Sequence, residues 1–509
     1  MKKSITNLNH KKNMSYQVNT LSSHKKKFQT DVMQVPAVLH VSDDLMPGNA
    51  TLEEIEKTAS SGYLFHHFAA LSDVHSKKGR KNPAGTVIAT ENFFLPQIND
   101  TAPNCGMRFL KSNLTDADLT SENIDKLFEA LIKQIPTKTY VGTKIPYSLV
   151  MDICRKGIEP AMQYFKTKTK NELENTFKSG NFSENVSEKD ILDSIPKLFL
   201  HIGKYRLGIL GAAGNHFLDL MKITELKDPV IAKKFGIYIG QYIFLMHTGS
   251  GLFGQYASYF YTPKKKEHLS QQIILELGKL TFNSSQSATH QALEKKISDY
   301  KTKSEYIAYD QNSPEGKLFI TAHRASANHG FANRTILTNN LYATIEKTLG
   351  KDPELDLLYD MPHVFIDQEE HFGKKVWVHR NNASRAFGPK KMTGHPIFSQ
   401  TGEPAFIPSS MSTPAYLAVG TDNNESTFFS SAHGTGKKKD PSEDKATTKE
   451  ALFQKMKTKN IKLYNAKSSG VIMQDSAYYK DINEVITGME DNEIIRVVAK
   501  MEPLAVLMY

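Results

Sequence analysis

The stretch LGAAGNHFLDL, at residues 210–220, decides how the rest of the chain is interpreted. A glycine-containing loop leads to Asn215 and His216, and an apolar run follows from Phe217. Loops of this kind, next to apolar segments, are where a rigid scaffold presents polar side chains. A single histidine in such a loop is more often a hydrogen-bonded structural residue than part of a site, so this stretch alone does not establish one.

Four further histidine-bearing clusters lie in loops of the same kind. They are Asp73-Val74-His75, His247-Thr248-Gly249-Ser250, Tyr359-Asp360-Met361-Pro362-His363 and Ser431-Ala432-His433-Gly434-Thr435-Gly436. The segment Asn104-Cys105-Gly106 adds a thiol. Because imidazole and thiolate are ligands for transition metals, several such loops in one chain favour a shared site over separate structural roles.

The loop around His433 carries a second suggestion. Small residues on both sides of this histidine would let a phosphate approach the backbone closely. A neutral imidazole in that position could attack a nucleotide phosphorus. The spacing fits a tight turn equally well, so both interpretations stay open at this point.

Length and periodicity indicate an α/β protein. At 509 residues the chain exceeds the roughly 250–300 residues of a single core, which leaves two domains or one large α/β body. Spacing and length predict helices at Ile124–Ile135 and Ile231–Met246. Short apolar runs predict strands at Gly85–Ala89, Val376–Val378, Ala405–Ile407, Tyr416–Val419 and Leu504–Met508.

Charge and cysteine content narrow the setting. A formal charge of +10 suits an anionic partner such as RNA without demanding one. Residues 1–30 contain no acidic side chain before Asp31 and are expected to form a basic, flexible leader, or a solvated one without a role. Two cysteines, Cys105 and Cys154, cannot build a disulfide framework, and no apolar run reaches the roughly 20 residues of a membrane span. The cytoplasm is the expected compartment.

The clusters together resemble the RtcB family of RNA-splicing ligases. LGAAGNHFLDL resembles the family's G-x-G-N-H-F-x-E signature, and MHTGSGLFG at 246–254 resembles its H-[ST]-G-S-R-G-L-G loop. Further matches follow in the family's order: ALSDVHSKKG, NCGMRFL, ANHGFANR, VHRNNASRAFGP, EPAFIPSSMSTPAYLAVG, SAHGTG and YKDINEVI. The resemblance runs from about residue 60 to the C-terminus. It implies one large body over residues 31–509, with mixed β-sheets, helices packed around them and a central metal cleft.

The resemblance also implies an activity and its residues. The family joins RNA ends carrying a 2′,3′-cyclic phosphate or 3′-phosphate to 5′-hydroxyl ends, using GTP and manganese. His433 matches the histidine that becomes linked to GMP. The implied metal ligands, with the cysteine bridging two ions, are Cys105, His216, His247 and His363. The implied nucleotide contacts are Asp73, Asn215, Phe217, Asp219, Ser410, Gly434, Gly436 and Tyr479, and the implied RNA contacts are Lys437 and Arg385.

Several site positions depart from the family pattern. Ala102 stands where the family has a metal-binding Asp, and the nearest acid is Asp100. Gly251 and Lys437 replace arginines, and Met508 replaces a lysine that contacts guanine. Two hypotheses follow: a working, divergent ligase, or a non-catalytic relative that binds RNA or nucleotide. An unrelated metallohydrolase would leave the ordered motifs unexplained. The resemblance implies RNA with broken ends as a partner and allows for a helper protein in turnover. The chain is expected to be a monomer.

Overall fold

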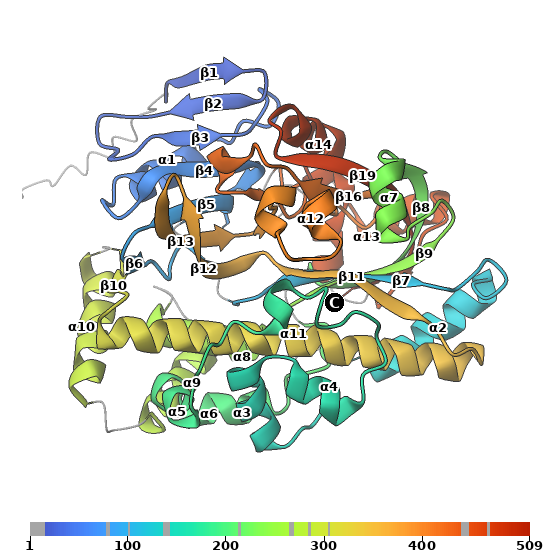
Figure 1. The fold of residues 1–509 in the computed structure, drawn as a ribbon, viewed down its shortest axis with the longest axis horizontal. Coiled ribbons are helices and arrows are strands. Elements are labelled where there is room, and N and C mark those ends of the chain that lie inside the picture. Colours follow the sequence, from blue (N-terminus) through green and yellow to red (C-terminus); the bar gives the residue numbers. More distant parts are fainter. Residues whose placement is uncertain are drawn as a thin grey trace, which may run out of the picture.

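The structure is a computed structural model that describes residues 16–77, 82–99, 102–135, 143–211, 215–263, 269–282, 287–303, 306–438, 447–465 and 469–508. Two large β-sheets form the upper part of the view in Figure 1, and the long helix α11 (Pro314–Leu349) runs below them. Further helices pack on the other side of α11. This mixed arrangement of sheets and helices confirms the α/β class expected from the sequence.

The first sheet has seven strands and carries β4 at its centre. Its order is β1 (Val18–Ser22), β2 (Lys25–Phe28), β3 (Ala37–Leu39), β4 (Phe65–His75), β5 (Ala84–Thr90), β13 (Lys374–Asn381) and β12 (Val364–His371). Neighbours are antiparallel except β3 and β4, which are parallel. Every residue of β5 is buried, as expected for a strand covered on both faces.

The second sheet has eight strands and supplies most of the candidate site. Its order is β11 (Leu355–Pro362), β7 (Gly106–Ser112), β9 (Tyr242–Thr248), β8 (Phe217–Leu226), β19 (Ile495–Met508), β16 (Ala415–Gly420) and β15 (Pro404–Ile407), with β18 (Lys462–Tyr464) parallel to β19. Two short pairs complete the strands: β6 (Phe93–Phe94) with β10 (Tyr309–Asp310), and β14 (Ala383–Arg385) with β17 (Ser430–Ala432).

The helices cover the sheets and form a layer of their own. They are α1 (Asn49–Ala59), α2 (Ser121–Gln134), α3 (Tyr147–Lys156), α4 (Glu159–Phe165), α5 (Glu188–Ser194), α6 (Lys197–Gly203), α7 (Pro229–Phe235), α8 (Gly251–Tyr261), α9 (Leu269–Leu280), α10 (Ser287–Lys303), α12 (Phe398–Thr401), α13 (Lys449–Thr458) and α14 (Ile482–Asp491). Within the described ranges, no helix combines the length and apolar character needed to cross a bilayer.

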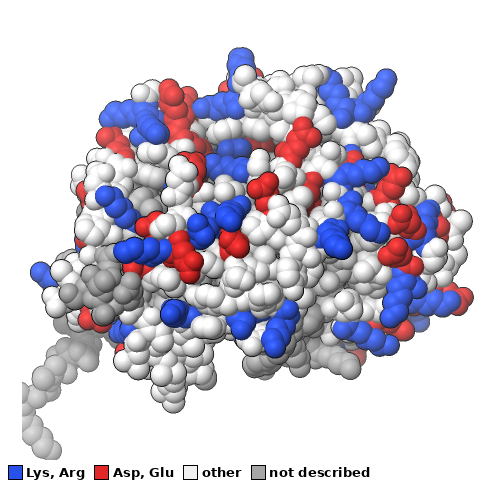
Figure 2. All heavy atoms as spheres, turned by 60° about the horizontal axis from the view of Figure 1, so that its bottom comes forward, with Lys and Arg blue, Asp and Glu red and all other residues white. Residues whose placement is uncertain are grey.

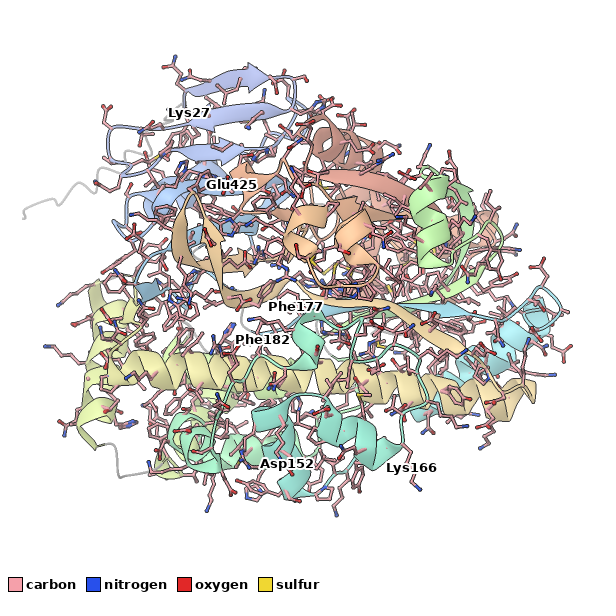
Figure 3. All side chains as sticks on the ribbon, in the orientation of Figure 1. Lys27, Asp152, Lys166, Phe177, Phe182 and Glu425 are labelled. Carbon is pink, nitrogen blue, oxygen red and sulfur yellow. The ribbon has the colours of Figure 1, made fainter. Side chains whose placement is uncertain are left out.

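Aromatic side chains fill the space between α11 and the strands above it. Phe177 and Phe182 stack with ring centroids 5.4 Å apart, and both pack against Phe365 of β12. Figure 3 shows the two labelled rings just above α11. Phe182 also stacks on Phe331 of α11. The helix is therefore anchored to the strands by buried rings, which makes it a rigid base for side chains that point toward the sheets.

The strand predictions are confirmed, and one helix prediction is wrong in its second half. All five predicted strands lie in β5, β13, β15, β16 and β19, and Ile124–Ile135 lies largely in α2. In the segment Ile231–Met246, however, α7 ends at Phe235 and β9 begins at Tyr242. Gly236 and Gly240, at φ +64° and +91°, turn the chain between them. Both glycines adopt a left-handed conformation that stops the helix, which the apolar spacing concealed.

The expectation of a flexible leader is wrong over its described part. Residues 1–15 lie outside the described residues, but β1 and β2 form an antiparallel pair at the edge of the first sheet. Lys26 is buried and its Nζ lies 2.5 Å from an Asp43 carboxylate oxygen, whereas Lys27 lies on the outer hairpin in Figure 3. Sheet pairing and an ion pair order this segment despite its charge.

Candidate metal and nucleotide site

Strand register brings the predicted metal ligands to one edge of the second sheet. Met107 on β7 pairs with His247 on β9, and Phe217 on β8 pairs with the same histidine. Cys105 and His216 each precede one of these paired residues by one or two positions. Pro362 at the end of β11 pairs with Gly106, so the next residue, His363, reaches the same edge. Ligands separated by up to 258 positions therefore converge because their strands are neighbours.

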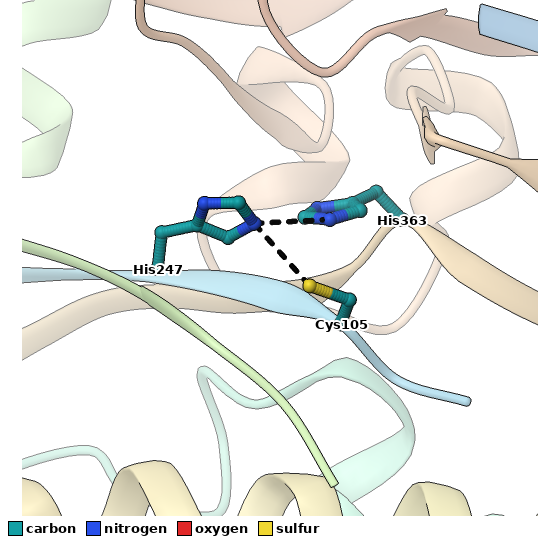
Figure 4. Close-up of side chains that lie close together, drawn as sticks. All are labelled: Cys105, His247 and His363. Atoms are coloured by element: carbon teal, nitrogen blue, oxygen red, sulfur yellow. Dashed lines mark hydrogen bonds between the residues drawn. The ribbon is translucent and has the colours of Figure 1, made fainter. Parts of the chain in front are cut away.

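The thiol and imidazoles are within contact distance of one another. Cys105 Sγ lies 3.4 Å from His216 Nε2 and 3.3 Å from His247 Nε2. His247 Nε2 lies 3.2 Å from His363 Nε2, as Figure 4 shows. The ligand atoms of Cys105, His247 and His363 all lie within 4.8 Å of one another. Cys105 thus forms a group with His247 and His363, and its sulfur also contacts His216.

The second ring nitrogens fix the orientation of two of these histidines. His216 Nδ1 lies 2.9 Å from the carbonyl oxygen of Leu210, and His247 Nδ1 lies 3.0 Å from that of Asn215. A carbonyl oxygen only accepts hydrogen bonds, so each Nδ1 must donate its proton. In a neutral ring this leaves Nε2 with a lone pair, and both lone pairs face Cys105. Such backbone-held imidazoles are typical of metal ligands.

Burial keeps these imidazoles neutral. It lowers the pKa of His216 to about 4. Burial, with contributions from neighbouring imidazoles, lowers the pKa of His247 and of His363 well below the usual value. A neutral imidazole is the form that binds a cation. The electrostatics and the geometry therefore favour the same state of the three rings.

Helix α11 holds the loops that carry the ligands. Arg334 donates to the backbone oxygens of Asn104 (3.1 Å) and Thr248 (2.7 Å), and it forms a buried ion pair with Asp360 at 2.7 Å. Asn333 donates to the carbonyl oxygens of Ile209 and Gly249, both at 3.0 Å. Two neighbouring side chains of one helix thus fix backbone segments from three different parts of the chain, including the residue before Cys105 and the one after His247.

His433 lies next to this group and is oriented by Asp73. Its Nδ1 lies 2.9 Å from Asp73 Oδ2, and its ring centroid lies 4.6 Å from that of His363. A carboxylate accepts, so Nδ1 donates and Nε2 keeps its lone pair. Strand β17 delivers His433 to this position, since Ala432 pairs with Ala383, whose N–H donates to the His363 carbonyl oxygen at 3.0 Å.

Two glycines make room for Asp73. A Cβ on Gly85 would lie 2.4 Å from Asp73 Oδ1, and a Cβ on Gly436 would lie 2.2 Å from the Asp73 backbone oxygen. Both glycines also have positive φ angles, +71° and +68°. Any side chain at either position would push Asp73 away from His433, so these glycines position the carboxylate as well as the turns.

Cys105, His216, His247 and His433 line a cleft of about 1410 Å³, whereas His363 is not among the lining residues and contacts His247. One end is apolar: its walls include Phe217, Met221, Leu245, Val506 and Met508. Asp219 lines the same end, is 7% exposed, and its Oδ1 has no hydrogen-bond partner. Burial raises the pKa of this carboxyl well above its usual value. An apolar slot with one unsatisfied carboxyl is suited to a flat ring that carries N–H donors.

Most of the other predicted residues line this cleft. They are Asn215, Ser410, Gly434, Gly436, Lys437 and Tyr479. Gly214 of the signature stretch and Asp100, the nearest acid to the thiol, lie outside the described residues. At the position of the missing Asp, Ala102 lines the cleft without a donor atom. Among the described residues, the group around Cys105 includes no carboxylate.

Arg385 is the predicted RNA contact that the structure does not bring to the cleft. It forms an ion pair with Glu403, with Nε 2.9 Å from the carboxylate, and its guanidinium lies over the rings of Phe177 and Phe387. Its side chain is 13% exposed. The structure therefore places this arginine in an ion pair away from the residues that line the cleft, and its contact with RNA stays a prediction. A partner carboxylate distant in sequence satisfies the charge, which the motif could not reveal.

The sequence analysis gave no role to Arg206 and Lys480, which also line the cleft, and His75 of the predicted histidine cluster lines it as well. Lys480 is 8% exposed, and its Nζ donates to the carbonyl oxygens of Leu45, Ser72 and Val74 at 3.3, 3.0 and 2.8 Å. Burial lowers its pKa to about 8. Its position directly after Tyr479, inside a matched motif, was the available signal. Nothing in the sequence distinguishes Arg206 from a surface arginine.

The residues present fit a transition-metal ion. Cys105, His247 and His363 bring a sulfur and two Nε2 atoms within 4.8 Å of one another, and His216 Nε2 lies 3.4 Å from the same sulfur, although one thiol proton can serve only one of these contacts. His363 Nδ1 is buried without a hydrogen-bond partner. A group with more lone pairs than protons is stabilised by a cation among them. Soft sulfur and imidazole donors suit a transition metal better than calcium or magnesium.

Fold and site together define a class: a mixed α/β protein with a Cys/His group that could hold a metal, beside a carboxylate-oriented histidine. A family model described as tRNA-splicing ligase RtcB matches residues 54–508. The chain therefore belongs to the RtcB family.

Similar proteins come from archaea and a eukaryote. The tRNA-splicing ligase RtcB of Nanoarchaeum equitans is 29% identical, covering 93% of this chain and 95% of that protein. That of Methanococcus maripaludis is 30% identical, covering 79% and 80%. RNA-splicing ligase RtcB homolog 1 of Entamoeba histolytica is 28% identical, covering 79% and 72%. The similarity extends over almost the whole chain, including every loop that carries a site residue.

Proposed function

We propose that this protein is an RNA ligase that joins RNA 2′,3′-cyclic phosphate or 3′-phosphate ends to 5′-hydroxyl ends, using GTP. One observation carries the proposal. His433 has its Nδ1 held by Asp73 and its ring against His363, so it presents a lone pair beside the Cys/His group. Relatives named as RNA-splicing or tRNA-splicing ligases support the choice of RNA as substrate.

In the first step His433 would act as the nucleophile. Its Nε2 attacks the α-phosphorus of GTP, an N–P bond forms, and the bond to the departing pyrophosphate breaks. The ring keeps its Nδ1 proton and becomes positively charged, a charge that the Asp73 carboxylate stabilises. The product is a histidine–GMP phosphoramidate.

Cys105, His216, His247 and His363 would hold the metal. Manganese bound there would supply charge stabilisation for phosphate oxygens. The chain's own residues do the remaining work in this step. Arg334 and Asn333 keep the ligand loops in place.

The guanine would occupy the apolar end of the cleft. A carboxylate can accept two N–H groups of guanine, and Asp219 lies in that end with an unsatisfied oxygen. Phe217 and Met508 line the same slot. Tyr479 lines the cleft close to Lys437, whose Nζ lies 5.5 Å from the centre of the tyrosine ring.

GMP would then move from His433 to the RNA 3′-phosphate, and the 5′-hydroxyl of a second RNA would attack, releasing GMP and forming a 3′,5′ bond. RNA needs cations along its path. Lysines that line the cleft are Lys77, Lys437, Lys438 and Lys480. Elsewhere, Figure 2 shows a face on which basic and acidic side chains are intermixed. The cleft is therefore the better route for the backbone than that face.

A second candidate function is a relative that binds RNA or nucleotide without joining ends. The observation that favours it is the donor group itself, which includes no carboxylate among the described residues and has Ala102 at the position of an expected ligand. One metal ion with sulfur and nitrogen ligands could bind a nucleotide without supporting transfer.

Adduct formation separates the two functions. Purified full-length protein is incubated with manganese and GTP labelled in the α-phosphate, and the acid-labile label on the chain is measured. A single turnover is followed because it does not depend on a helper protein. We expect label on the unaltered protein, none on His433→Ala, and normal label on the matched control His395→Ala, a partly exposed histidine that does not line the cleft. Unlabelled wild-type protein would support the binding function.

A further inference from the structure

The cleft opens at Gly251, next to the metal ligands. Gly251 begins α8 and lines the cleft with Leu252 and Gln255. A Cβ placed on Gly251 would have no atom within 4 Å. The same loop touches the thiol segment, because a Cβ on Gly249 would lie 2.6 Å from Cys105 Cα. Open space therefore lies directly beside the donor group, on its α8 side.

Arg206 lies on the loop that faces this opening. The loop follows α6, and Arg206 N donates to the Gly203 carbonyl oxygen at 3.1 Å. Asn333 ties this loop to the Gly251 loop, since its amide bonds Ile209 in one and Gly249 in the other. Arg206 lines the cleft, and its charge acts on Tyr256 of α8, whose pKa burial raises and Arg206 lowers in part.

Arg206 differs from the other cations of the cleft in chemistry and position. Among the described residues that line the cleft, Arg206 is the only arginine, and the other permanently charged basic side chains are lysines. A guanidinium presents a planar fork that binds two oxygens of one phosphate, which an ammonium does not.

We propose that Arg206 binds a phosphate group on the α8 side of the Cys/His group, and that this phosphate is the terminal 3′-phosphate of an RNA end. The inference rests on the proposed function. A nucleotide phosphate has the same chemistry, but the base-binding end is built from β8 and β19, whereas Arg206 comes from the helical layer of α6 and α8. The resemblance implies an arginine at the position of Gly251. In this chain the guanidinium would come from Arg206, in a different loop.

Binding of RNA without GTP tests the assignment directly. The probes are two short single-stranded RNAs of one sequence, one ending in a 3′-phosphate and one in a 3′-hydroxyl. For the full-length protein we expect the phosphate end to bind more tightly. Arg206→Gln should lose about tenfold in affinity for the phosphate RNA and little for the hydroxyl RNA, and the slope of log K against log salt should fall by about one.

Two variants serve as comparisons. Arg206→Lys keeps the charge without the fork, so its affinity for the phosphate RNA should lie between that of the unaltered protein and Arg206→Gln. Arg496→Gln removes the same charge from a site outside the cleft, where Arg496 pairs with Asp228 at 2.7 Å and its side chain is 67% exposed. It should keep the preference for the phosphate end.

Adduct formation distinguishes the sources of phosphate. If Arg206 binds RNA, Arg206→Gln should impair RNA joining at least tenfold more than histidine–GMP formation. A higher KM for GTP in adduct formation with an intact RNA preference would assign Arg206 to the nucleotide and overturn the proposal. Equal loss of both RNA probes would assign it to general packing and overturn it as well. Failure of the wild-type protein to form any adduct would instead count against the proposed function, and the binding comparison would still decide the role of Arg206.

Discussion

The two ends of the cleft are built in different ways. At the metal end, His216 and His247 are each held by a backbone carbonyl, and Arg334 fixes the loops that carry the ligands. At the base end, Asp219 stands among apolar side chains with an unsatisfied oxygen. The loops of the metal end are thus fixed by hydrogen bonds before any ligand arrives, whereas the carboxyl of the base end would find its partner only in a ligand.

This difference separates chemistry from recognition. A reacting group must be held within a fraction of an ångström, and redundant hydrogen bonds achieve that. A recognition slot can tolerate an unsatisfied carboxyl in the free protein because the ligand removes the penalty on binding. Substitutions should therefore affect rate and fold most strongly at the metal end, and pH dependence and nucleotide preference at the base end.

The largest expected effect comes from Asp73→Asn. The amide keeps the shape but can donate to His433 Nδ1, which favours the ring tautomer whose Nε2 carries the proton and cannot attack phosphorus. The rate of histidine–GMP formation should fall by on the order of 10³- to 10⁴-fold. Metal content, measured in parallel, should stay normal because Asp73 is not in the donor group. A decrease of less than tenfold in the rate of histidine–GMP formation would show that Asp73 does not act in this step.

Arg334→Met should cause the largest loss of stability. Arg334 and Asp360 are both fully buried, and removal of the arginine leaves the carboxylate with Arg108 alone while freeing two loop carbonyls. The free energy of unfolding should fall by about 3–5 kcal/mol, as measured by urea denaturation. Arg155→Met, on the surface of α3 where Arg155 lies 4.0 Å from Asp152 (labelled in Figure 3), should change it by less than about 1 kcal/mol. Equal decreases in the free energy of unfolding for the two variants would show that the buried contacts of Arg334 do not stabilise the fold more than a surface ion pair does.

Lys480→Met tests whether Lys480 positions Asp73. Lys480 Nζ binds the carbonyl oxygens on both sides of Asp73, and its backbone N–H donates to the Gly436 carbonyl oxygen at 3.2 Å. Loss of the ammonium should loosen Asp73 and slow adduct formation about tenfold, with KM for GTP changed little. The control Lys391→Met removes an exposed lysine outside the cleft. If KM rises while kcat stays constant, Lys480 contacts the nucleotide rather than positioning Asp73.

Asp219→Asn should produce the smallest effect, visible in the pH dependence of stability. Because burial raises the folded pKa of Asp219, its contribution is full below the unfolded pKa and is lost as pH rises toward the folded pKa. Unfolding measured as the pH rises from about pH 4 should therefore show the wild-type protein losing stability relative to Asp219→Asn. Parallel curves would mean that the carboxyl titrates normally and is better solvated than the structure indicates.

The sequence revealed the metal end more fully than the base end. Cys105, His216 and His247 stand in glycine-bearing loops beside apolar runs, and loop composition and motif order are local properties that a sequence displays. Arg385 shows what a motif cannot predict. Its ion-pair partner Glu403 lies 18 positions later in the sequence, directly before β15, and only the folded structure brings the two side chains together. Arg206 became visible only when the loops were placed in space, whereas Lys480 was indicated by its place in a matched motif.

Fold prediction met the same boundary. Short apolar runs identified β5, β13 and β16, because a short strand is defined by adjacent residues. The helix α11 was not anticipated, since burial on nearly all sides leaves it without an apolar stripe. Its polar residues Asn333 and Arg334 look like surface side chains in the sequence, yet they bind loop carbonyls in the interior.

Anomalous diffraction at the manganese edge, on crystals of the full-length protein grown with manganese, would locate the bound ion. We expect a strong peak in contact with Cys105 Sγ and with Nε2 of His247 and His363, a few ångströms from the His433 ring. A map without a peak there, or with manganese bound only at other side chains, would contradict this expectation.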